Sequence, residues 1–425
     1  MDFAFSAEQQ MLRAAARDYL TDRYPFERVV EVADGELGSD PAAWPQLVEL
    51  GWVGLSVPEG HGGAGMSFLD EVVLFEEAGR ALLPAPYFAT VGLALPALAA
   101  AAPAGGGADT LLAGVLAGKR TATLAWAEAD GPVALVDVEA VSVTASRTPD
   151  GWALTGTKRF VPDLAAVSDV IVVARAEDGV GLWRVDLRAG TEGGADGGAE
   201  VGAEVGAAVA AAVGAAVAAA VGAAVGATVV VPRSTMDRTR RLGDLVLTAT
   251  PATLLVSPGQ AKPVLEQVRL RALAALAGEA VGVAERCLEI AAEYTKTRQQ
   301  FGRVIGTYQG VSHRIADIFV ALQLARSLAY WAAWAVSVGA AEAPLACAAA
   351  KSAAGEAAVF AAENAIQAMG GIGFTWDHPL HRYYKRALGI DAFEGYGREH
   401  RADIAAALLD APTVESPVPD TATGA

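Results

Sequence analysis

The sequence predicts a multidomain protein of α and β structure, with helices at both ends and strands in the middle. Apolar residues recur at helical spacing before residue 116, short β-type runs follow, and long helical seams begin after residue 258. We therefore expect an N-terminal helical domain over residues 1–116, a middle β-domain over 117–257 and a C-terminal helical bundle over 258–411. The tail over 412–425 is rich in Pro, Thr and Ser and is expected to be disordered.

Helix signals alternate with helix breakers along the first 116 residues. Ser6 is a candidate N-cap of a helix whose apolar face includes Met11, Leu12 and Leu20. We expect a second helix over residues 71–83, because two prolines follow it. Further helices are expected over residues 44–52, 93–102 and 111–116.

The periodicity changes after residue 117, where short apolar runs are separated by turn residues. Asp150 and Gly151 form a strong hairpin-turn signal between two of these runs. The middle region is therefore predicted to be β-structure. The expected strands lie at 121–126, 133–136, 141–143, 152–154, 170–173, 182–185, 229–231 and 245–247.

A low-complexity stretch interrupts the middle region over about residues 189–228. Residues 205–231 carry no charge and are long enough to suggest a membrane span. However, they consist of Val, Ala and Gly with one Thr, and they contain no Leu, Ile or Phe. Valine recurs at every fourth residue from Val201 to Val229, which is typical of repeat expansion. We interpret the stretch as a surface insertion; an interaction or aggregation-prone element is the alternative.

Long helices are predicted beyond residue 258. Two apolar series, beginning at Leu276 and Ile315, step by three and four residues and so favour a helix bundle. A third long helix is expected over 343–369, because Gly370 and Gly371 follow it, and a short last helix over 403–409.

Composition excludes several classes of function. The net charge is −17 and the pI is near 4.8, which argues against a nucleic-acid partner. Cys287 and Cys347 lack metal-ligand spacing, so we expect two buried thiols in a reducing compartment and no metal site. The first residues have no basic segment followed by an apolar one, so we expect a cytoplasmic protein without an export signal and without a membrane anchor.

Three short motifs carry residues with chemical potential. An arginine such as Arg298 offers forked donors that suit a pyrophosphate. A glycine pair such as Gly370 and Gly371 lets a backbone approach a ligand closely. A glutamate such as Glu394 can act as a base. The motifs are Arg298-Gln-Gln-Phe301-Gly302 with Gln309, Gln367-Ala368-Met369-Gly370-Gly371, and Glu394-Gly395.

These motifs, in this order of domains, resemble the acyl-CoA dehydrogenase family. The first two motifs look like its two best-known signatures, and Leu50-Gly51-Trp52 with Val57-Pro58-Glu59 resembles an N-terminal one. The similarity spans nearly the whole chain apart from the insertion and the tail. It implies a middle β-barrel or β-sandwich, a C-terminal four-helix bundle, an acyl-CoA substrate, FAD as cofactor and an electron-transfer flavoprotein as acceptor.

The resemblance also implies where FAD is held. In the family FAD lies at a subunit interface, so the chain is expected to form a homo- or hetero-oligomer, a dimer or tetramer. Arg298, Phe301 and Gln309 would reach the FAD of a neighbouring subunit, with Arg298 on the pyrophosphate. The residues expected on the other side of the same adenosine diphosphate moiety are Gln367, Ala368, Met369, Gly370 and Gly371.

The resemblance assigns the catalytic base to Glu394. The family removes a proton α to a thioester while hydride passes to the flavin, which needs a carboxylate in a dry site. Glu394 follows Gly371 by 23 residues, the spacing of the short- and medium-chain branches. Another branch carries its base on the first bundle helix, where this chain has Ala272. After Glu394-Gly395 the sequence departs from the family pattern, because Tyr396 stands where the family usually has threonine.

The middle domain departs further from the family pattern. The family's Thr-Glu-Pro…Gly-Ser-Asp run is reduced to a stretch from Trp126 to Gly131. Pro162 replaces a threonine whose hydroxyl can approach the flavin, and proline offers no donor. We therefore expect altered or missing contacts to the flavin ring, and a better preserved adenosine side.

Three alternatives to a working dehydrogenase stay open. The chain could be a weakly active or non-catalytic subunit that completes the FAD site of a different partner, as occurs in steroid side-chain degradation in this family. It could be a flavoprotein of related fold that reacts with O₂. Arg298 could be a solvated helix-end residue and Glu394 an exposed carboxylate, in which case only a structural role would remain.

Overall fold

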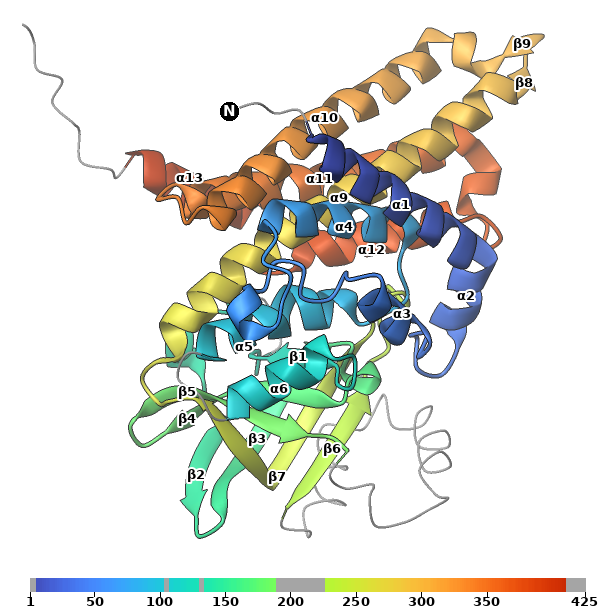
Figure 1. The fold of residues 1–425 in the computed structure, drawn as a ribbon. Coiled ribbons are helices and arrows are strands. Elements are labelled where there is room, and N and C mark those ends of the chain that lie inside the picture. Colours follow the sequence, from blue (N-terminus) through green and yellow to red (C-terminus); the bar gives the residue numbers. More distant parts are fainter. Residues whose placement is uncertain (1–4, 103–106, 130–133, 189–225, 410–425) are drawn as a thin grey trace, which may run out of the picture.

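The computed structural model describes residues 5–102, 107–129, 134–188 and 226–409. The uncharged valine-rich run up to residue 225 and the tail from residue 410 lie outside the described residues. A helical layer, a β-barrel and a helical bundle follow one another along the chain (Figure 1). The predicted order of helical, β and helical domains is confirmed, whereas the exact boundaries after residues 116 and 257 stay predictions.

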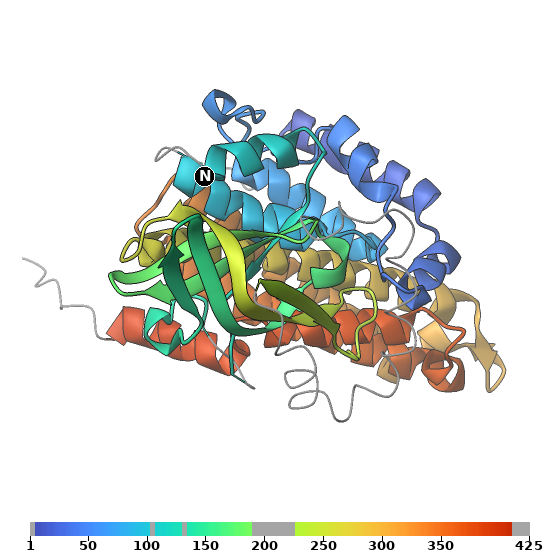
Figure 2. The same cartoon turned by 90° about the horizontal axis from the view of Figure 1, so that it is seen from below.

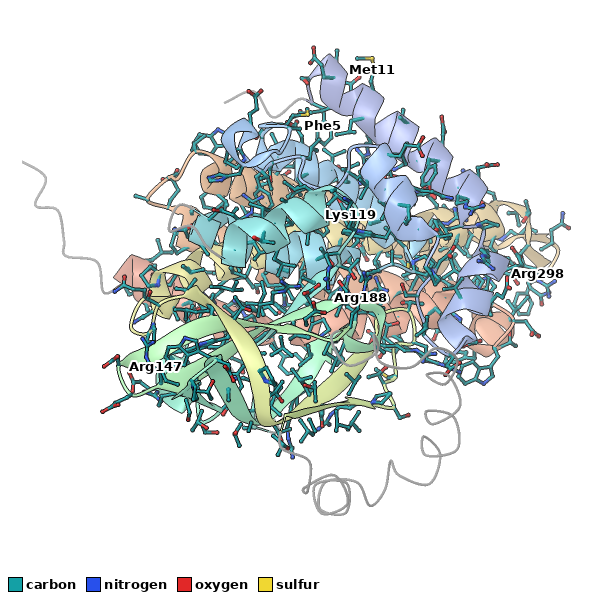
Figure 3. The ribbon with its side chains drawn as sticks, turned by 60° about the horizontal axis from the view of Figure 1, so that its bottom comes forward. Phe5, Met11, Lys119, Arg147, Arg188 and Arg298 are labelled. Carbon is teal, nitrogen blue, oxygen red and sulfur yellow. The ribbon has the colours of Figure 1, made fainter. Side chains whose placement is uncertain are left out.

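Helices form the N-terminal part of the chain. A capping box joins Ser6 and Gln9 at the start of α1, and Leu20 is buried while Met11 is exposed at the surface (Figure 3). The expected helix over 93–102 is wrong at its start, because a π-helical segment, η2 (Phe88–Ala94), leads into α5. The helices are α1 (Ala7–Arg23), α2 (Phe26–Asp34), α3 (Ala43–Glu49), α4 (Phe68–Ala81), α5 (Leu95–Ala101) and α6 (Gly107–Leu116).

The middle strands close into a barrel, which selects the barrel over the sandwich. Neighbouring strands pair in the closed order β2, β3, β7, β5, β4 and back to β2, while β1 pairs with β4 and β6 with β7 (Figure 2). Trp183 and Leu154 are buried inside this barrel. The strands are β1 (Ala122–Ala125), β2 (Thr144–Thr148), β3 (Gly151–Pro162), β4 (Asp169–Ala176), β5 (Gly179–Asp186), β6 (Ala227–Pro232) and β7 (Leu242–Val256).

Two predicted strands are absent from the described part of the barrel. Residues 134–136 form a turn, and 141–143 have no regular structure. The backbone N–H groups of Ser142 and Val143 donate to the carboxylate of Glu128 at 2.7 and 3.1 Å, so neither completes a strand pair. Tertiary contacts therefore override the local β-type pattern here. The hairpin predicted at Asp150 and Gly151 is confirmed between β2 and β3.

The C-terminal part is the expected bundle. Its helices are α9 (Ala261–Thr297), α10 (Gln309–Ser337), α11 (Ala343–Met369) and α12 (Leu380–Ala392), followed by α13 (Gly397–Leu409). The last helix begins six residues earlier than the predicted 403. Gly282 lets α9 pack directly on α4, because a Cβ there would lie 1.8 Å from the carbonyl oxygen of Glu76.

A buried charge network joins the barrel to the bundle. The guanidinium of Arg386 on α12 donates to Asp237 at 2.8 Å and to Glu279 on α9 at 2.6 Å. Arg240 donates to the other oxygen of Glu279 at 2.6 Å. Because each of these charges is paired, the network fixes how the loop before β7 sits on α9 and α12.

Asp163 beside this network makes folding stability depend on pH. Burial raises the pKa of its carboxyl to about 6, against the opposing charges of Arg240 and Arg386. The folded state therefore holds its proton up to higher pH than the unfolded state, so this contribution to stability falls as pH rises from about 4 to about 6. Asparagine tolerates the left-handed backbone at this position, where φ is 49°.

We expect Asp163→Asn to remove this pH-dependent step. Relative to the variant, the native protein should lose up to roughly 3 kcal/mol of unfolding free energy across that window. Urea denaturation of both proteins from about pH 4 to about pH 7 measures the difference. A native-minus-variant difference that stays constant over this range would contradict the assignment.

Candidate active site

Arg298 and Phe301 project from one end of the bundle. Arg298 is the C-cap of α9, and the hairpin of β8 (Gln299–Gln300) and β9 (Arg303–Val304) follows it. Phe301 and Gly302 form its two-residue turn with φ values of 51° and 81°, which is the geometry of a tight β-hairpin. The Phe301 side chain is 92% exposed. An exposed phenyl ring on a strained backbone indicates a residue shaped for contact with another molecule.

The Arg298 guanidinium has no hydrogen-bond or ion-pair partner within the described chain. Figure 3 shows it at the edge of the molecule, where α9 ends. Gln309 begins α10 on the far side of the hairpin, and only its neighbour His313 approaches its amide, at 3.3 Å. These donors are therefore available to a ligand or to a second subunit.

The residues from Gln367 to Gly371 lie at the same end of the bundle. Arg314 on α10 donates to Asn364 on α11 at 2.7 Å, which ties the start of α10 to the last turns of α11. A Cβ added at Gly370 or Gly371 would meet no atom within 4 Å, so the backbone there is open to close approach. Gln367 is exposed and Ala368 is half-buried, whereas the Met369 side chain packs in the core.

The structure thus gathers all eight predicted cofactor-binding residues at one end of the bundle. A forked cation without a partner, amide donors and an uncovered glycine pair fit the pyrophosphate and adenosine of a dinucleotide. Met369 can contribute only through its backbone, because its side chain is buried. The individual roles of these residues stay predictions.

Glu394 lies at the other end of the bundle, just after α12. Its side chain is fully buried, so the alternative of an exposed carboxylate is wrong. One oxygen, Oε2, accepts from Arg269 Nε at 2.9 Å, and Oε1 accepts from the backbone N–H of Leu135 at 2.5 Å. Burial raises the pKa of this carboxyl, while Arg269 and the Leu135 N–H oppose the rise. Its φ of 58° is a strained, left-handed value.

Three residues that support Glu394 escaped the sequence analysis. Arg269 and Leu135 contact its carboxylate, and Lys351 on α11 holds the turn that carries it. The Lys351 Nζ donates to the carbonyl of Asp391 at 3.0 Å and to that of Gly395 at 3.4 Å. A single lysine on the apolar, alanine-rich part of α11 was the signal that could have identified Lys351.

We expect Lys351→Met to destabilise this turn. Lys351 is buried, which lowers the pKa of its ammonium to about 8 but leaves it charged at neutral pH. The variant leaves the carbonyls that bracket Glu394 without a donor, at a cost of about 1–3 kcal/mol. Chemical denaturation at neutral pH measures this, with Lys262→Met on the exposed start of α9 as control. Equal stability of the two variants would show that Lys351 does not hold the turn.

The two halves of the predicted site lie far apart within one chain. Arg269, the partner of Glu394, and Arg298 are 29 residues apart along α9. At the rise of an α-helix this is roughly 40 Å. Arg269, with its partner Glu394, and Arg298 therefore lie toward opposite ends of α9.

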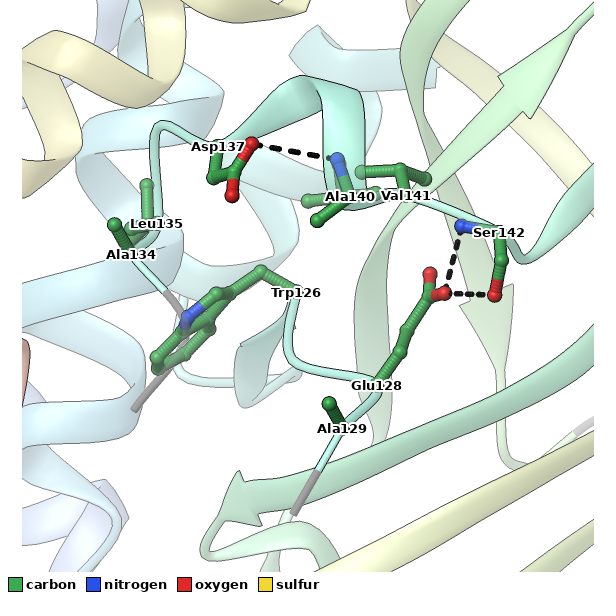
Figure 4. A pocket seen from close by; sticks show the side chains of 10 residues that line it. Trp126, Glu128, Ala129, Ala134, Leu135, Asp137, Ala140, Val141 and Ser142 are labelled. Atoms are coloured by element: carbon green, nitrogen blue, oxygen red, sulfur yellow. Dashed lines mark hydrogen bonds between the residues drawn. The ribbon is translucent and has the colours of Figure 1, made fainter. Parts of the chain in front are cut away.

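A cavity of about 190 Å³ lies on the barrel side, and its lining includes Leu135, whose backbone N–H donates to Glu394 (Figure 4). Trp126 and Leu135 line it, and Trp126 packs edge-on against Phe393 with ring centroids 5.5 Å apart. Glu128, also in its lining, binds the buried Lys158 at 2.5 Å and the backbone of the following loop. Glu128 is thus structural rather than free.

Phe160 and Pro162, the residues expected on the flavin-ring side, both lie near the end of β3. Pro162 is buried and supplies no hydroxyl. Phe160 has a left-handed backbone with φ of 54°, and the guanidinium of Arg233 lies 4.1 Å from its ring centroid. These two residues offer aromatic and apolar surface, but no side-chain donor, to a ring placed there.

Two helical segments of the described bundle are long and apolar enough to cross a membrane: Gln309–Ser337 and Ala343–Phe374. The second is mostly buried inside the bundle, as a core helix of a soluble fold is. The first is much less buried, and its side chains Phe319, Val320 and Leu324 are exposed. An apolar face of this kind marks a surface for contact with another molecule.

Known proteins resemble the chain over almost its full length. Family models match two segments: "Acyl-CoA dehydrogenase, N-terminal domain" over residues 6–104 and "Acyl-CoA dehydrogenase, C-terminal domain" over residues 269–409. The acyl-CoA dehydrogenase IpdE2 of Mycobacterium tuberculosis is 30% identical over 385 residues, which make up 90% of this chain and 91% of that protein.

Two solved structures of steroid-related and heteromeric proteins share the fold. The Tcur3481–Tcur3483 steroid ACAD superposes with a TM-score of 0.75 at 30% identity, covering 95% of this chain and 98% of that one. A chain of the ChsE4–ChsE5 complex from Mycobacterium tuberculosis gives 0.77 at 25% identity, covering 97% and 100%. With its motifs, its fold and these relatives, the chain belongs to the acyl-CoA dehydrogenase family of oxidoreductases.

Proposed function

We propose that the protein is a cytoplasmic, FAD-dependent acyl-CoA dehydrogenase that introduces an α,β double bond into an acyl-CoA thioester. Glu394 removes the α proton, and bound FAD would supply the two-electron acceptor. Arg298, Phe301, Gln309 and the segment from Gln367 to Gly371 bind the FAD whose substrate faces the Glu394 of another subunit. An electron-transfer flavoprotein is the proposed acceptor of the electrons.

The observation that carries this proposal is the separation of roughly 40 Å along α9 between the Glu394 end and the Arg298 end. Each end offers half of a site: a buried carboxylate at one, unpaired donors and open glycines at the other. A symmetric dimer brings opposite ends together twice, and so completes two sites. The exposed apolar residues Phe319, Val320 and Leu324 support such an assembly.

The buried carboxylate suits the role of a base. A dry environment raises the pKa of Glu394, which makes its carboxylate a better proton acceptor. The charge of Arg269 opposes this rise in the pKa of Glu394. The left-handed backbone, held by Lys351 through the carbonyls on either side, fixes the direction of the carboxylate.

A second candidate is a weakly active or non-catalytic subunit of a heteromeric dehydrogenase. Both Glu394 oxygens already have partners, and Pro162 stands where the family has a flavin-contacting threonine. The similar ChsE4–ChsE5 structure is a complex of two different chains. In this case Arg298 and Gln309 would complete the FAD site of the other subunit.

The absorbance spectrum of the protein purified alone separates the two candidates. A yellow protein whose flavin bleaches with an acyl-CoA under anaerobic conditions supports the first. A colourless protein that gains flavin only with a co-expressed homologous partner supports the second. Flavin that is re-oxidised rapidly by O₂ with formation of peroxide would contradict both and favour an oxidase.

A further inference from the structure

A second cavity, of about 230 Å³, lies where the loop before β7 meets α12. Arg238 and Met236 line it from the loop, Trp376 lines it from the turn before α12, and Arg382 and Lys385 line it from the first turns of α12. Its lining includes none of the predicted cofactor residues, and Glu394 follows the opposite end of α12. None of the residue roles proposed above for the dehydrogenase involves it.

The cavity carries surplus positive charge in a chain whose net charge is −17. Arg238, Arg382 and Lys385 face it, and Asp34 is the carboxylate that serves both arginines, at 3.2 and 2.8 Å. The carboxylate of Asp237, also in the lining, is already paired with Arg386. One acidic group therefore balances three cations.

Arg382 shows that the cations are not fully satisfied. Its side chain is 8% exposed, and its Nε has no hydrogen-bond partner among the described residues. A buried N–H without a partner is costly, and an anion in the cavity would remove that cost. Desolvation and the neighbouring Arg382 lower the pKa of Lys385, which an anion would reverse.

The remaining walls suit a flat ring. The indole of Trp376 is 74% exposed, with the Lys385 ammonium 4.2 Å from its ring centroid. Met236 is also largely exposed beside it. An exposed aromatic face next to forked cations is the arrangement that stacks a base and pairs a phosphate.

We propose that this cavity binds an adenosine diphosphate group, with the adenine on Trp376 and the phosphates on Arg238, Arg382 and Lys385. Two sources share this chemistry: a free adenine nucleotide, or the 3′-phospho-ADP end of coenzyme A. Binding of free ADP does not depend on the proposed dehydrogenase activity. A failure of this proposal can therefore be distinguished from a failure of the roles proposed for Glu394 and Arg298.

Calorimetric titration of the full-length protein with ADP tests the site. We expect saturable binding that Lys385→Ala and Trp376→Ala each weaken at least about tenfold, while Lys262→Ala on exposed α9 leaves it unchanged. Trp376 lies on the surface, so its variant should fold even if another fails. Absent binding, equal affinity in all variants, or equal affinity for ADP and inorganic phosphate would each overturn the proposal.

Competition distinguishes the two sources. If coenzyme A displaces bound ADP from the native protein, with the displacement weakened in Trp376→Ala, the site serves the coenzyme. If ADP stays bound at saturating coenzyme A, the site serves a free nucleotide. Either result supports an adenosine diphosphate site, and neither depends on flavin content.

Discussion

Replacing Glu394 by glutamine should abolish reduction of the flavin by an acyl-CoA while leaving the flavin bound. Glutamine keeps the size and the hydrogen-bonding reach of the side chain but cannot accept the α proton. A positioned general base contributes about 100-fold to 10,000-fold to a rate, so we expect a loss of at least about 100-fold. Anaerobic stopped-flow absorbance with acyl-CoA thioesters of short and long chain measures the rate.

The control for this prediction is Glu399→Gln, five residues along the same segment. Glu399 pairs with Arg398 at the surface and has no contact with the Glu394 carboxylate in the described structure. We expect this variant to reduce flavin at close to the native rate. An undiminished rate in Glu394→Gln, with normal flavin content, would show that another group is the base.

Arg298→Ala should lower the amount of FAD that stays bound to the protein. A guanidinium that pairs with a pyrophosphate across an interface contributes about 2–5 kcal/mol, because its removal leaves the phosphate charge unpaired. The variant should emerge from gel filtration with much less flavin per chain than the native protein. Its own fold should persist, since Arg298 is exposed and its side chain pairs with no described residue.

Arg23→Ala is the matched control for this loss. Arg23 is also exposed and lies at the end of a helix, α1, with no ion-pair partner among the described residues. We expect its flavin content to equal that of the native protein. A native flavin content in Arg298→Ala would remove Arg298 from the cofactor site.

Local sequence patterns were sufficient to predict the helices, most of the strands and the grouping of the candidate cofactor residues at one end of the bundle. Arg298 ends α9, Gln309 begins α10 and the Gly370–Gly371 pair follows α11, so three adjacent helices bring them to one end of the bundle. Helical periodicity and glycine positions encode such an arrangement directly. The barrel closure follows less directly, since it depends on pairing of β4 with β5 and of β5 with β7.

The surroundings of Glu394 could not be predicted from the sequence, because its contacts are distant along the chain. Arg269 lies 125 residues before it and Leu135 lies 259 residues before it. The polar neighbours Arg398 and Arg401 favour an exposed helix end, yet the turn points the carboxylate inward. Long-range packing therefore determines that the Glu394 carboxylate is buried. It also determines that the residues near Leu135 do not form the predicted strands.

The central claim, that Arg298 and Glu394 of one chain serve different sites, can be tested by mixing two inactive variants. Glu394→Gln and Arg298→Ala chains carrying different tags are co-expressed, and mixed dimers are isolated through both tags. If the site is shared between subunits, each mixed dimer has one site with both residues intact, and flavin reduction returns to about half of the native level. If the mixed dimers stay as inactive as the separate variants, the two residues act within one chain and the account is contradicted.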